Sequence, residues 1–305
     1  MSKKMLEGKV ALVTGAGGGI GRAIAHVMAD NGAHVVVNDL GAAVDGAGKD
    51  ETKAQQVVNE INTKHGQGTA VANGDSVADW DAAQRMVKTA VDSFGKIDIV
   101  VNNAGILRDT IFHRMTPEEF DAVVKVHLDG AFYVSRAAIP FFRAQEGGAF
   151  IHMTSTSGLI GSVGQVNYAA AKLGIAGMSR GIAGDAARYK VRSNCIGPHA
   201  FSRMIESIPG QSEAAMAERA AKTRPDQVAQ LAAFLGSDAA ADISGQIFGA
   251  RGNEIYLYNQ PRPVRTIQRG DGWTVETLAQ TIPGAWKNSF TPLERTRDVY
   301  PYDAI

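Results

Sequence analysis

The sequence predicts an α/β fold in which helices cover both faces of a doubly wound parallel sheet. Two observations lead to this prediction. Short apolar, β-branched runs alternate with longer helical stretches, and strands that are apolar throughout are typical of a sheet buried on both faces. Glycine also clusters directly behind the first apolar run, where the chain has to turn sharply. The length of 305 residues suits one α/β domain of roughly 250 residues with an appendage.

The predicted elements follow one another in a regular order. Short apolar runs predict strands at residues 9–14, 34–38, 69–72, 97–102, 149–153, 190–196 and 246–250. The longer stretches between them predict helices at residues 20–31, 51–65, 79–94, 116–127, 131–143, 167–189 and 225–235. Because helices that join parallel strands form right-handed crossovers, this order predicts a Rossmann-type sheet in a single domain.

Two stretches depart from the alternation. Residues 39–50 form a polar loop of unusual length that is rich in Gly and Ala, and beyond Gly252 the pattern ends in a tail that holds Trp273 and Trp286. We therefore expect a main domain at residues 1–252 and a C-terminal extension at residues 253–305. The aromatic residues of the extension indicate that it packs on the domain or on a sister subunit, or alternatively that it covers a cleft.

Composition excludes several classes of protein. Lys and Arg total 31, as do Asp and Glu, whereas a nucleic-acid binder needs a basic excess. The single Cys excludes an intramolecular disulfide framework, no apolar run approaches the length of a membrane span, and the seven His show no metal-ligand spacing. The last four residues do not resemble a peroxisomal signal, so we expect a cytoplasmic protein. Because the His residues lack ligand spacing, we expect no bound metal.

The glycine cluster predicts a dinucleotide site. Between the first strand and the first helix, glycines allow a tight turn, and backbone N–H groups at the helix N-terminus favour a pyrophosphate. The cofactor-binding residues predicted here are Gly15, Gly17, Gly18, Gly19, Ile20 and Gly21. Residues 1–252 are therefore expected to form a dinucleotide-binding catalytic domain.

The ends of the next strands predict which dinucleotide binds. Asp39 ends the second strand, where a carboxylate accepts hydrogen bonds from an adenosine ribose and repels a 2′-phosphate, so we expect NAD. Asp75, followed by Ser76, either bonds the adenine amino group or caps a helix. A further group follows the fourth strand at the ligand-binding edge of the sheet: Asn103, Ala104 and Gly105.

A second group of residues predicts proton transfer. Tyr168 and Lys172 lie four residues apart on one helix and so share a face. An ammonium about 4 Å from the phenol contributes roughly 4 kcal/mol at a dielectric of about 20, or about three pKa units before desolvation opposes the shift. Tyr168 would then exchange protons near neutral pH, while Ser155, just past the fifth strand, holds the substrate oxygen.

These motifs resemble those of the short-chain dehydrogenase/reductase family over about residues 5–250. The matching segments are Thr14-Gly-x-x-x-Gly-Ile-Gly21, Asn103-Ala-Gly105, Ser155 and Tyr168-x-x-x-Lys172. The resemblance implies hydride transfer with NAD(P), Tyr168 as general acid/base, and a Lys172 that lowers the pKa of this phenol and binds the nicotinamide ribose. It also implies a homodimer or homotetramer.

Further segments are similar to one branch of this family. Val37-Asn-Asp-Leu-Gly41, Asn103-Ala-Gly-Ile-Leu-Arg-Asp109, Val126-His-Leu128 and Gly164-Gln-x-Asn-Tyr168 resemble the (3R)-hydroxyacyl-CoA dehydrogenase unit of peroxisomal multifunctional enzyme type 2. That enzyme is related to 17β-hydroxysteroid dehydrogenase type 4. The resemblance implies an acyl-CoA or steroid substrate. Part of it is shared with 3-oxoacyl-ACP reductases.

Three positions depart from the family pattern. His127 stands where the family usually has an Asn that supports a proton path to the Lys; it either relays protons or is a hydrogen-bonded structural residue. Pro198 is followed by His instead of Gly, and Ser202 is a candidate contact to the nicotinamide carboxamide.

The residues and the resemblance together predict an NAD-dependent dehydrogenase that oxidises a secondary alcohol, most simply a 3-hydroxyacyl-CoA, including one derived from a steroid. The alternatives are a hydroxysteroid dehydrogenase, an NADPH-dependent 3-oxoacyl-ACP reductase and, least favoured, a non-catalytic NAD-binding protein. The intact set of Ser155, Tyr168 and Lys172 argues against the last of these.

Overall fold

A computed structural model describes residues 4–48, 50, 52–200 and 222–301, and its centre is a single mixed sheet of eight strands. The strands, in spatial order, are β3 (Ala70–Asn73), β2 (His34–Asn38), β1 (Val10–Thr14), β4 (Ile99–Asn102), β5 (Gly148–Met153), β6 (Val191–His199), β7 (Ile247–Arg251) and β8 (Glu254–Leu257). Neighbours are parallel from β3 to β7, whereas β8 runs antiparallel to β7. The doubly wound Rossmann-type fold is therefore confirmed.

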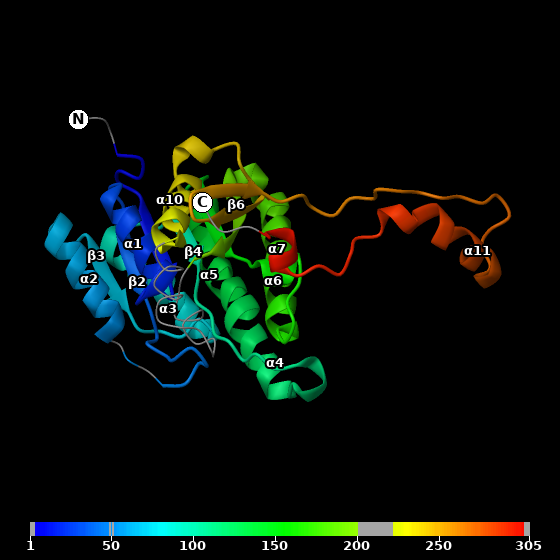
Figure 1. Ribbon diagram of the computed structural model, residues 1–305. Coiled ribbons are helices and arrows are strands. Elements are labelled where there is room, and N and C mark those ends of the chain that lie inside the picture. The colour runs from blue at the N-terminus through cyan, green and yellow to red at the C-terminus, as the bar shows by residue number, and fades with distance from the viewer. Residues whose placement is uncertain (1–3, 49, 51, 201–221, 302–305) are drawn as a thin grey trace.

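Helices cover both faces of the sheet (Figure 1). One layer holds α1 (Gly19–Asp30), α2 (Thr52–His65) and α10 (Pro225–Gly236). The other holds α3 (Trp80–Phe94), α5 (Gly130–Ala144) and α7 (Val166–Ala186). Strands β1 and β4 are buried along their whole length and β2 is buried beyond His34, which is why they read as apolar runs in the sequence.

The winding of the chain determines where a ligand can bind. The chain moves outward from β1 to β3 and then returns to place β4 on the other side of β1. At such a switch point the loops behind the strands diverge and leave a crevice at the carboxyl edge of the sheet. The polar motifs of the sequence follow β1, β2, β3, β4 and β5, so all of them lie at this edge.

Two predicted helices of the middle segment form one continuous stretch. After η1 (Phe112–Arg114), α4 (Pro117–Val124) begins with a capping box on Thr116 and Glu119 and passes through the π-helical turn η2 (Lys125–Asp129) directly into α5. The prediction of separate helices was wrong in this respect. A short helix, α6 (Thr156–Leu159), was also not predicted.

The C-terminal extension has more regular structure than its sequence indicated. The antiparallel strand β8 follows Gly252-Asn253, a pair typical of two-residue hairpin turns, and Gly252 has a positive φ of 55°. Beyond it, α11 (Val275–Trp286) continues into η5 (Lys287–Ser289) and stands away from the body (Figure 1). The chain then returns through α12 (Thr296–Val299), where the hydroxyl of Tyr300 bonds that of Tyr258 at 2.6 Å.

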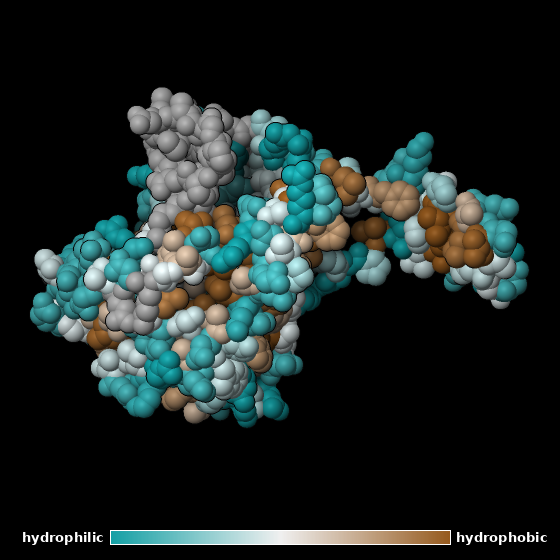
Figure 2. Space-filling model, turned by 90° about the horizontal axis from the view of Figure 1, so that it is seen from below, coloured by the Kyte–Doolittle hydropathy of each residue, from teal (hydrophilic) through white to brown (hydrophobic). Residues whose placement is uncertain are grey.

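Short helical turns complete the fold: η3 (Ala187–Tyr189) follows α7, and η4 (Asp238–Ala240) follows α10. Figure 2 shows apolar side chains gathered in the region of α11, on the part of the extension that projects from the domain. Within the part of the chain that the structure describes, no helix combines the length and apolar character needed to cross a bilayer.

Candidate active site

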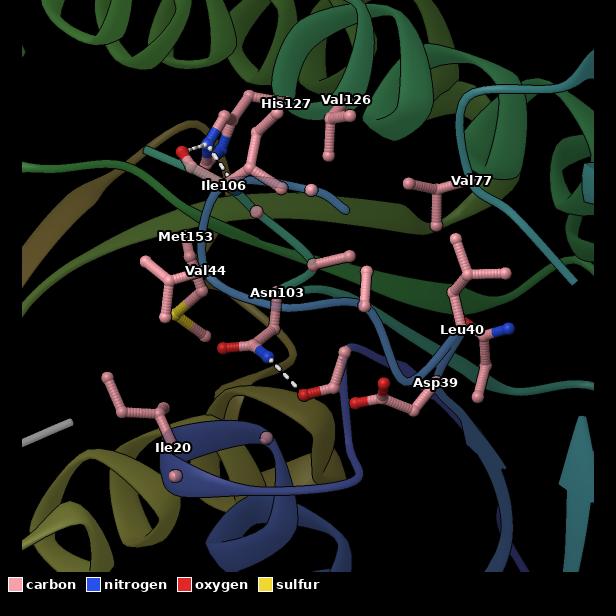
Figure 3. A pocket seen from close by; sticks show the side chains of 18 of the residues that line it. Ile20, Asp39, Leu40, Val44, Val77, Asn103, Ile106, Val126, His127 and Met153 are labelled. Carbon is pink, nitrogen blue, oxygen red and sulfur yellow. Dashed lines mark hydrogen bonds between the residues drawn. The ribbon is translucent and has the colours of Figure 1, made fainter. Parts of the chain in front are cut away.

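A cavity of about 380 Å³ lies at the switch point of the sheet (Figure 3). It brings together most of the residues predicted as a site: Gly15, Gly18, Gly19, Ile20, Gly21, Asp39, Asp75, Ser76, Asn103, Ala104, Gly105, His127, Tyr168, Lys172 and Pro198. Gly17 and Ser155 do not line the cavity, and Ser202 falls outside the residues that the structure describes.

The glycine-rich turn is packed so closely that side chains have no room. A Cβ atom on Gly21 would lie 2.2 Å from the carbonyl oxygen of Gly15 and 2.5 Å from Nδ2 of Asn103. The Asn103 amide in turn donates to the carbonyls of Thr14 and Gly15, at 2.9 and 3.1 Å, and Figure 3 marks one hydrogen bond from this amide. This turn is therefore held by the loop behind β4 as well as by its own strand.

The helix that follows offers its N-terminus to the cavity. Helix α1 is capped by Gly18, whose position supplies no side-chain cap, so the first N–H groups of the helix are not bonded by a capping side chain. Together with the helix dipole, such groups bind phosphate oxygens. The absence of side chains along the turn gives a pyrophosphate direct access, so these residues fit a dinucleotide.

Asp39 is fixed from two sides by backbone groups. Its Oδ2 accepts a hydrogen bond from the N–H of Gly17 at 2.7 Å, and its Oδ1 accepts one from the N–H of Gly41 at 2.6 Å. A Cβ atom on Gly17 would lie 2.8 Å from Cγ of Asp39. Gly17 therefore acts on the site by orienting this carboxylate at the cavity wall.

Asp75 is oriented by side chains. Nε and Nη2 of Arg85 donate to its Oδ1 at 3.0 and 2.6 Å, and the Asn73 amide donates to its Oδ2 at 3.0 Å. The residue that caps α3 is Asp79, which accepts a hydrogen bond from the N–H of Ala82 at 2.6 Å. The alternative that Asp75 is a helix cap is therefore wrong, and its carboxylate lines the cavity instead.

The catalytic candidates meet where β5 ends and α7 begins. Lys172 is buried, its Nζ donates to the carbonyl of Met153 at 2.7 Å, and it lies 5.4 Å from the centre of the Tyr168 ring. Ser155 caps α6 and accepts a hydrogen bond from the N–H of Ser157 at 3.2 Å. Its side chain also bonds that of Tyr168, so the three predicted residues form one group.

The protonation of this group differs from the sequence-based expectation. Burial raises the pKa of Tyr168 to about 12, although the hydrogen bond with Ser155 opposes the rise. Burial lowers the pKa of Lys172 to about 7. In this structure, burial therefore shifts the pKa of the phenol in the direction opposite to the lowering expected from an adjacent ammonium.

His127 is a buried residue of the π-helical turn. Its Nε2 lies 2.8 Å from the carbonyl oxygen of Ile106 and 3.1 Å from the N–H of the same residue. Its ring meets that of Tyr168 edge-on, with centroids 5.1 Å apart. Burial, and then the charge of Lys172, hold the pKa of His127 well below its ordinary value, so the imidazole is neutral.

The other ring nitrogen of His127, Nδ1, is not engaged by the contacts with Ile106. Nδ1 is buried and has no hydrogen-bond partner among the described residues. A second cavity of about 10 Å³ lies between His127 and Lys172 and is also lined by Asn102. A volume of this order accommodates one water molecule.

The sequence did not predict one wall of the main cavity. Ala42, Ala43, Val44 and Gly46 line it, and all four belong to the long loop behind Asp39. The unusual length of that loop was visible in the sequence, but its composition gave no sign of where it folds. Figure 3 shows Val44 at the cavity with Ile20 and Met153.

Comparison with known proteins identifies the class of protein that carries this site. A family model described as short chain dehydrogenase matches residues 9–208. The chain therefore belongs to the short-chain dehydrogenase family. It is an oxidoreductase that acts on CH–OH groups with a nicotinamide cofactor, NAD(P).

Individual relatives are similar over different shares of their length. Rv0148, a short-chain type dehydrogenase/reductase of Mycobacterium tuberculosis, is 48% identical over 78% of this chain and 80% of its own. Peroxisomal multifunctional enzyme type 2 of Mus musculus is 49% identical over 66% of this chain, which spans 27% of that enzyme. The hydroxyacyl-CoA dehydrogenase ChsB1 of Mycobacterium tuberculosis is 38% identical over 91% of this chain and 88% of its own.

A solved structure is similar over nearly the whole chain. The crystal structure of a short chain dehydrogenase from Mycobacterium avium has a TM-score of 0.82 and 39% identity, and the match covers 94% of this chain and 98% of that one. The predicted resemblance to the family and to the multifunctional enzyme is confirmed.

Proposed function

We propose that this protein is an NAD-dependent dehydrogenase that oxidises the hydroxyl group of a 3-hydroxyacyl-CoA, including one with a steroid-derived acyl group. The single observation that carries the choice of cofactor is Asp39, a carboxylate that lines the cavity and is held in place by two backbone N–H groups. The name of ChsB1, which matches this chain over most of its length, supports the class of substrate.

Asp39 favours NAD for an electrostatic reason. A carboxylate at the end of β2 accepts hydrogen bonds from the two ribose hydroxyls of NAD, whereas it repels the 2′-phosphate of NADP. Replacing it with Ser should lower the affinity for NADH about tenfold, because hydrogen bonds to a charged group contribute about 1.5–3 kcal/mol. The same change should also reduce the ratio of the affinity for NADH to that for NADPH. Fluorescence titration with each cofactor would measure this ratio.

A bound nicotinamide would supply the hydride acceptor, and the residues of this chain handle the proton. We assign to Ser155 the role of holding the substrate oxygen through its hydroxyl, and to Tyr168 the relay of the proton. Because burial keeps the phenol protonated, it passes its own proton towards neutral Lys172 as it takes the one that leaves the substrate oxygen. Lys172 is fixed by the carbonyl of Met153, so its remaining N–H groups are available for the nicotinamide ribose. A buried lysine with a pKa of about 7 changes charge in the physiological range and can pass the proton onward.

His127 has a positioning role in this proposal. Its neutral ring is anchored on Ile106, and its Nδ1, which has no hydrogen-bond partner among the described residues, lies in the region of Lys172. His127→Asn should retain much of the turnover, because an amide also supplies a hydrogen-bonding group. His127→Leu should reduce turnover at neutral pH more than at alkaline pH. A purely structural residue would instead show equal losses at both pH values.

The experiment that tests the function is a substrate panel with both cofactors. Purified protein is assayed with 3-hydroxyacyl-CoA thioesters of increasing chain length, with hydroxysteroids, and with a 3-oxoacyl-ACP in the reducing direction. The proposal expects the highest kcat/KM for an acyl-CoA with NAD. A preference for free steroids, or for the ACP substrate with NADPH, would establish one of the alternative enzymes. Cofactor binding without turnover of any substrate would indicate the non-catalytic alternative.

The division of the chain and its assembly are also proposals. We propose that residues 1–252 form the catalytic domain and that the extension at 253–305 packs at its two ends on this domain and along α11 on a sister subunit. The protein would then be a cytoplasmic homodimer or homotetramer. Light scattering of the whole chain, compared with the variant Trp273→Ser in the extension, would test the assembly.

A further inference from the structure

The long loop behind Asp39 folds over the cofactor cavity as a strap, which we define as residues 40–48. Its residues alternate in exposure: Ala42, Val44 and Gly46 are half-buried, while Asp45 and Ala47 are exposed. The half-buried set lines the same cavity as the glycine-rich turn, so the cavity lies between the two segments. Figure 3 shows the strap passing from Leu40 along the cavity to Val44.

The strap is tied to the loop behind β4 at its far end. The N–H of Leu107 donates to the carbonyl of Val44 at 2.9 Å, and Nε of Arg108 donates to the carbonyl of Asp45 at 2.9 Å. At the base, the N–H of Asp50 donates to the carbonyl of Leu40 at 3.1 Å. The strap is therefore a closed loop with a fixed base and a tip held by a few hydrogen bonds.

Residues 106–108, the segment that holds the tip, are also hydrogen-bonded to residues beside Tyr168. Ile106, next to the strap tip, is the partner of His127, and the carbonyl of Arg108 accepts a hydrogen bond from the side chain of Asn167 at 2.9 Å. Asn167 immediately precedes Tyr168 on α7. Ile106 therefore links the tip to His127, whose ring packs on that of Tyr168, and Arg108 links it to Asn167, the residue before Tyr168.

We infer that the strap is a gate for the dinucleotide, and that Arg108 is the positioning residue that fastens it. The inference rests on the proposed cofactor site. A dinucleotide that binds between the turn and the strap enters or leaves when the tip separates from residues 106–108. Arg108 holds a backbone carbonyl of the strap, so it controls the rates of cofactor entry and release without touching the reacting atoms.

The first test is the release rate of NADH from Arg108→Ala, measured by stopped-flow fluorescence. Loss of one hydrogen bond from a charged donor should raise this rate about tenfold. The rate of hydride transfer in a single turnover should stay unchanged. Arg114→Ala is the matched control, because this exposed arginine of η1 lies outside the cavity. Equal release rates in Arg108→Ala and wild type would overturn the inference.

A second variant locks the gate. A Cβ atom on Gly46 would lie 3.9 Å from Cβ of Ile106, a separation that suits a disulfide. Cys195, the one cysteine of the sequence, is buried, so Gly46→Cys/Ile106→Cys provides the reactive pair. Oxidation before NADH is added should slow binding more than tenfold, and reduction should restore it. Oxidation after binding should trap the cofactor.

The two tests separate failure of the gate from failure of the proposed function. If the oxidised and reduced double variants bind and release NADH equally fast, the gate is wrong while the cofactor site stands. If wild-type protein binds neither NADH nor NADPH, the proposed function itself is wrong, and the gate has no cofactor to control. Because Gly46 has a φ of 89° and resists substitution, Arg108→Ala decides the question if the double variant does not fold.

Discussion

The cofactor cavity has two glycine-rich walls that differ in how tightly they are held. The turn behind β1 is packed against Asn103 and its own backbone so tightly that Gly21 leaves no space for a Cβ atom. The strap is as tight at its base, where a Cβ atom on Gly41 would lie 2.0 Å from the carbonyl oxygen of Asp50, but Gly48 has nothing within 4 Å of the place where a Cβ atom would be. The first wall is therefore closely packed, whereas the second combines a tight base with an open stretch, as the proposed gate requires.

The largest effect is expected from the fixed side of the cavity, where the chemistry takes place. Tyr168→Phe removes the hydroxyl that carries the proton and should reduce turnover by a factor of about 10²–10⁴. Affinity for NADH should change little, because the ring and its packing on His127 remain. Initial rates together with NADH titration would measure both. Turnover close to that of wild type would refute the assigned role.

A pair of glycine substitutions compares the walls directly. In Gly21→Ala the new methyl group would lie 2.2 Å from the carbonyl oxygen of Gly15, so the turn has to shift and NADH affinity should fall about 100-fold, or about 2.7 kcal/mol. Isothermal titration would measure this.

The matched change in the strap is Gly48→Ala, which should leave NADH affinity nearly unchanged. Because Gly48 has a φ of 80°, this variant should still lose about 1 kcal/mol of stability in urea unfolding. Equal losses of affinity in the two variants would show that cofactor binding depends equally on both walls.

A further effect concerns the dependence of stability on pH. Below pH 7 Lys172 is protonated in both the folded and the unfolded chain, whereas above it the unfolded chain retains a proton that the folded chain has released. The free energy of unfolding should therefore rise between pH 7 and pH 9 by up to about 1.4 kcal/mol per pH unit. The raised pKa of Tyr168 acts only above about pH 10.

Lys172→Met should flatten this rise, whereas Lys88→Met, which removes an exposed lysine, should keep it. Urea titrations at several pH values would show the difference. A rise that persists in Lys172→Met would assign the pH dependence to other groups.

The sequence predicted seven of the eight strands, the order of the main helices and the place of most site residues, because these follow from local signals. Apolar runs define the buried strands, and the glycine turn and Asp39 come directly after strands one and two. The pKa of Tyr168 could not be predicted, since it depends on how deeply tertiary packing buries the phenol. The strap could not be predicted for a similar reason: its role depends on Leu107 and Arg108, residues distant in sequence that hold its tip.

Strand β8 was not predicted, although the sequence before it carries a hairpin signal. The pair Gly252-Asn253 between two apolar runs indicates a hairpin, but the second run has only four residues and alternates in burial at the edge of the sheet. Its pairing adds an antiparallel edge strand to an otherwise parallel sheet and ties the start of the extension to the domain.

The most direct test is the initial rate at which a 3-hydroxyacyl-CoA reduces NAD to NADH and, in parallel, NADP to NADPH, for wild type and Tyr168→Phe. Wild type should form NADH steadily and NADPH much more slowly, and the variant should form almost none of either. Absence of NAD reduction with every acyl-CoA tested, or equal rates for the two proteins, would contradict the proposed function.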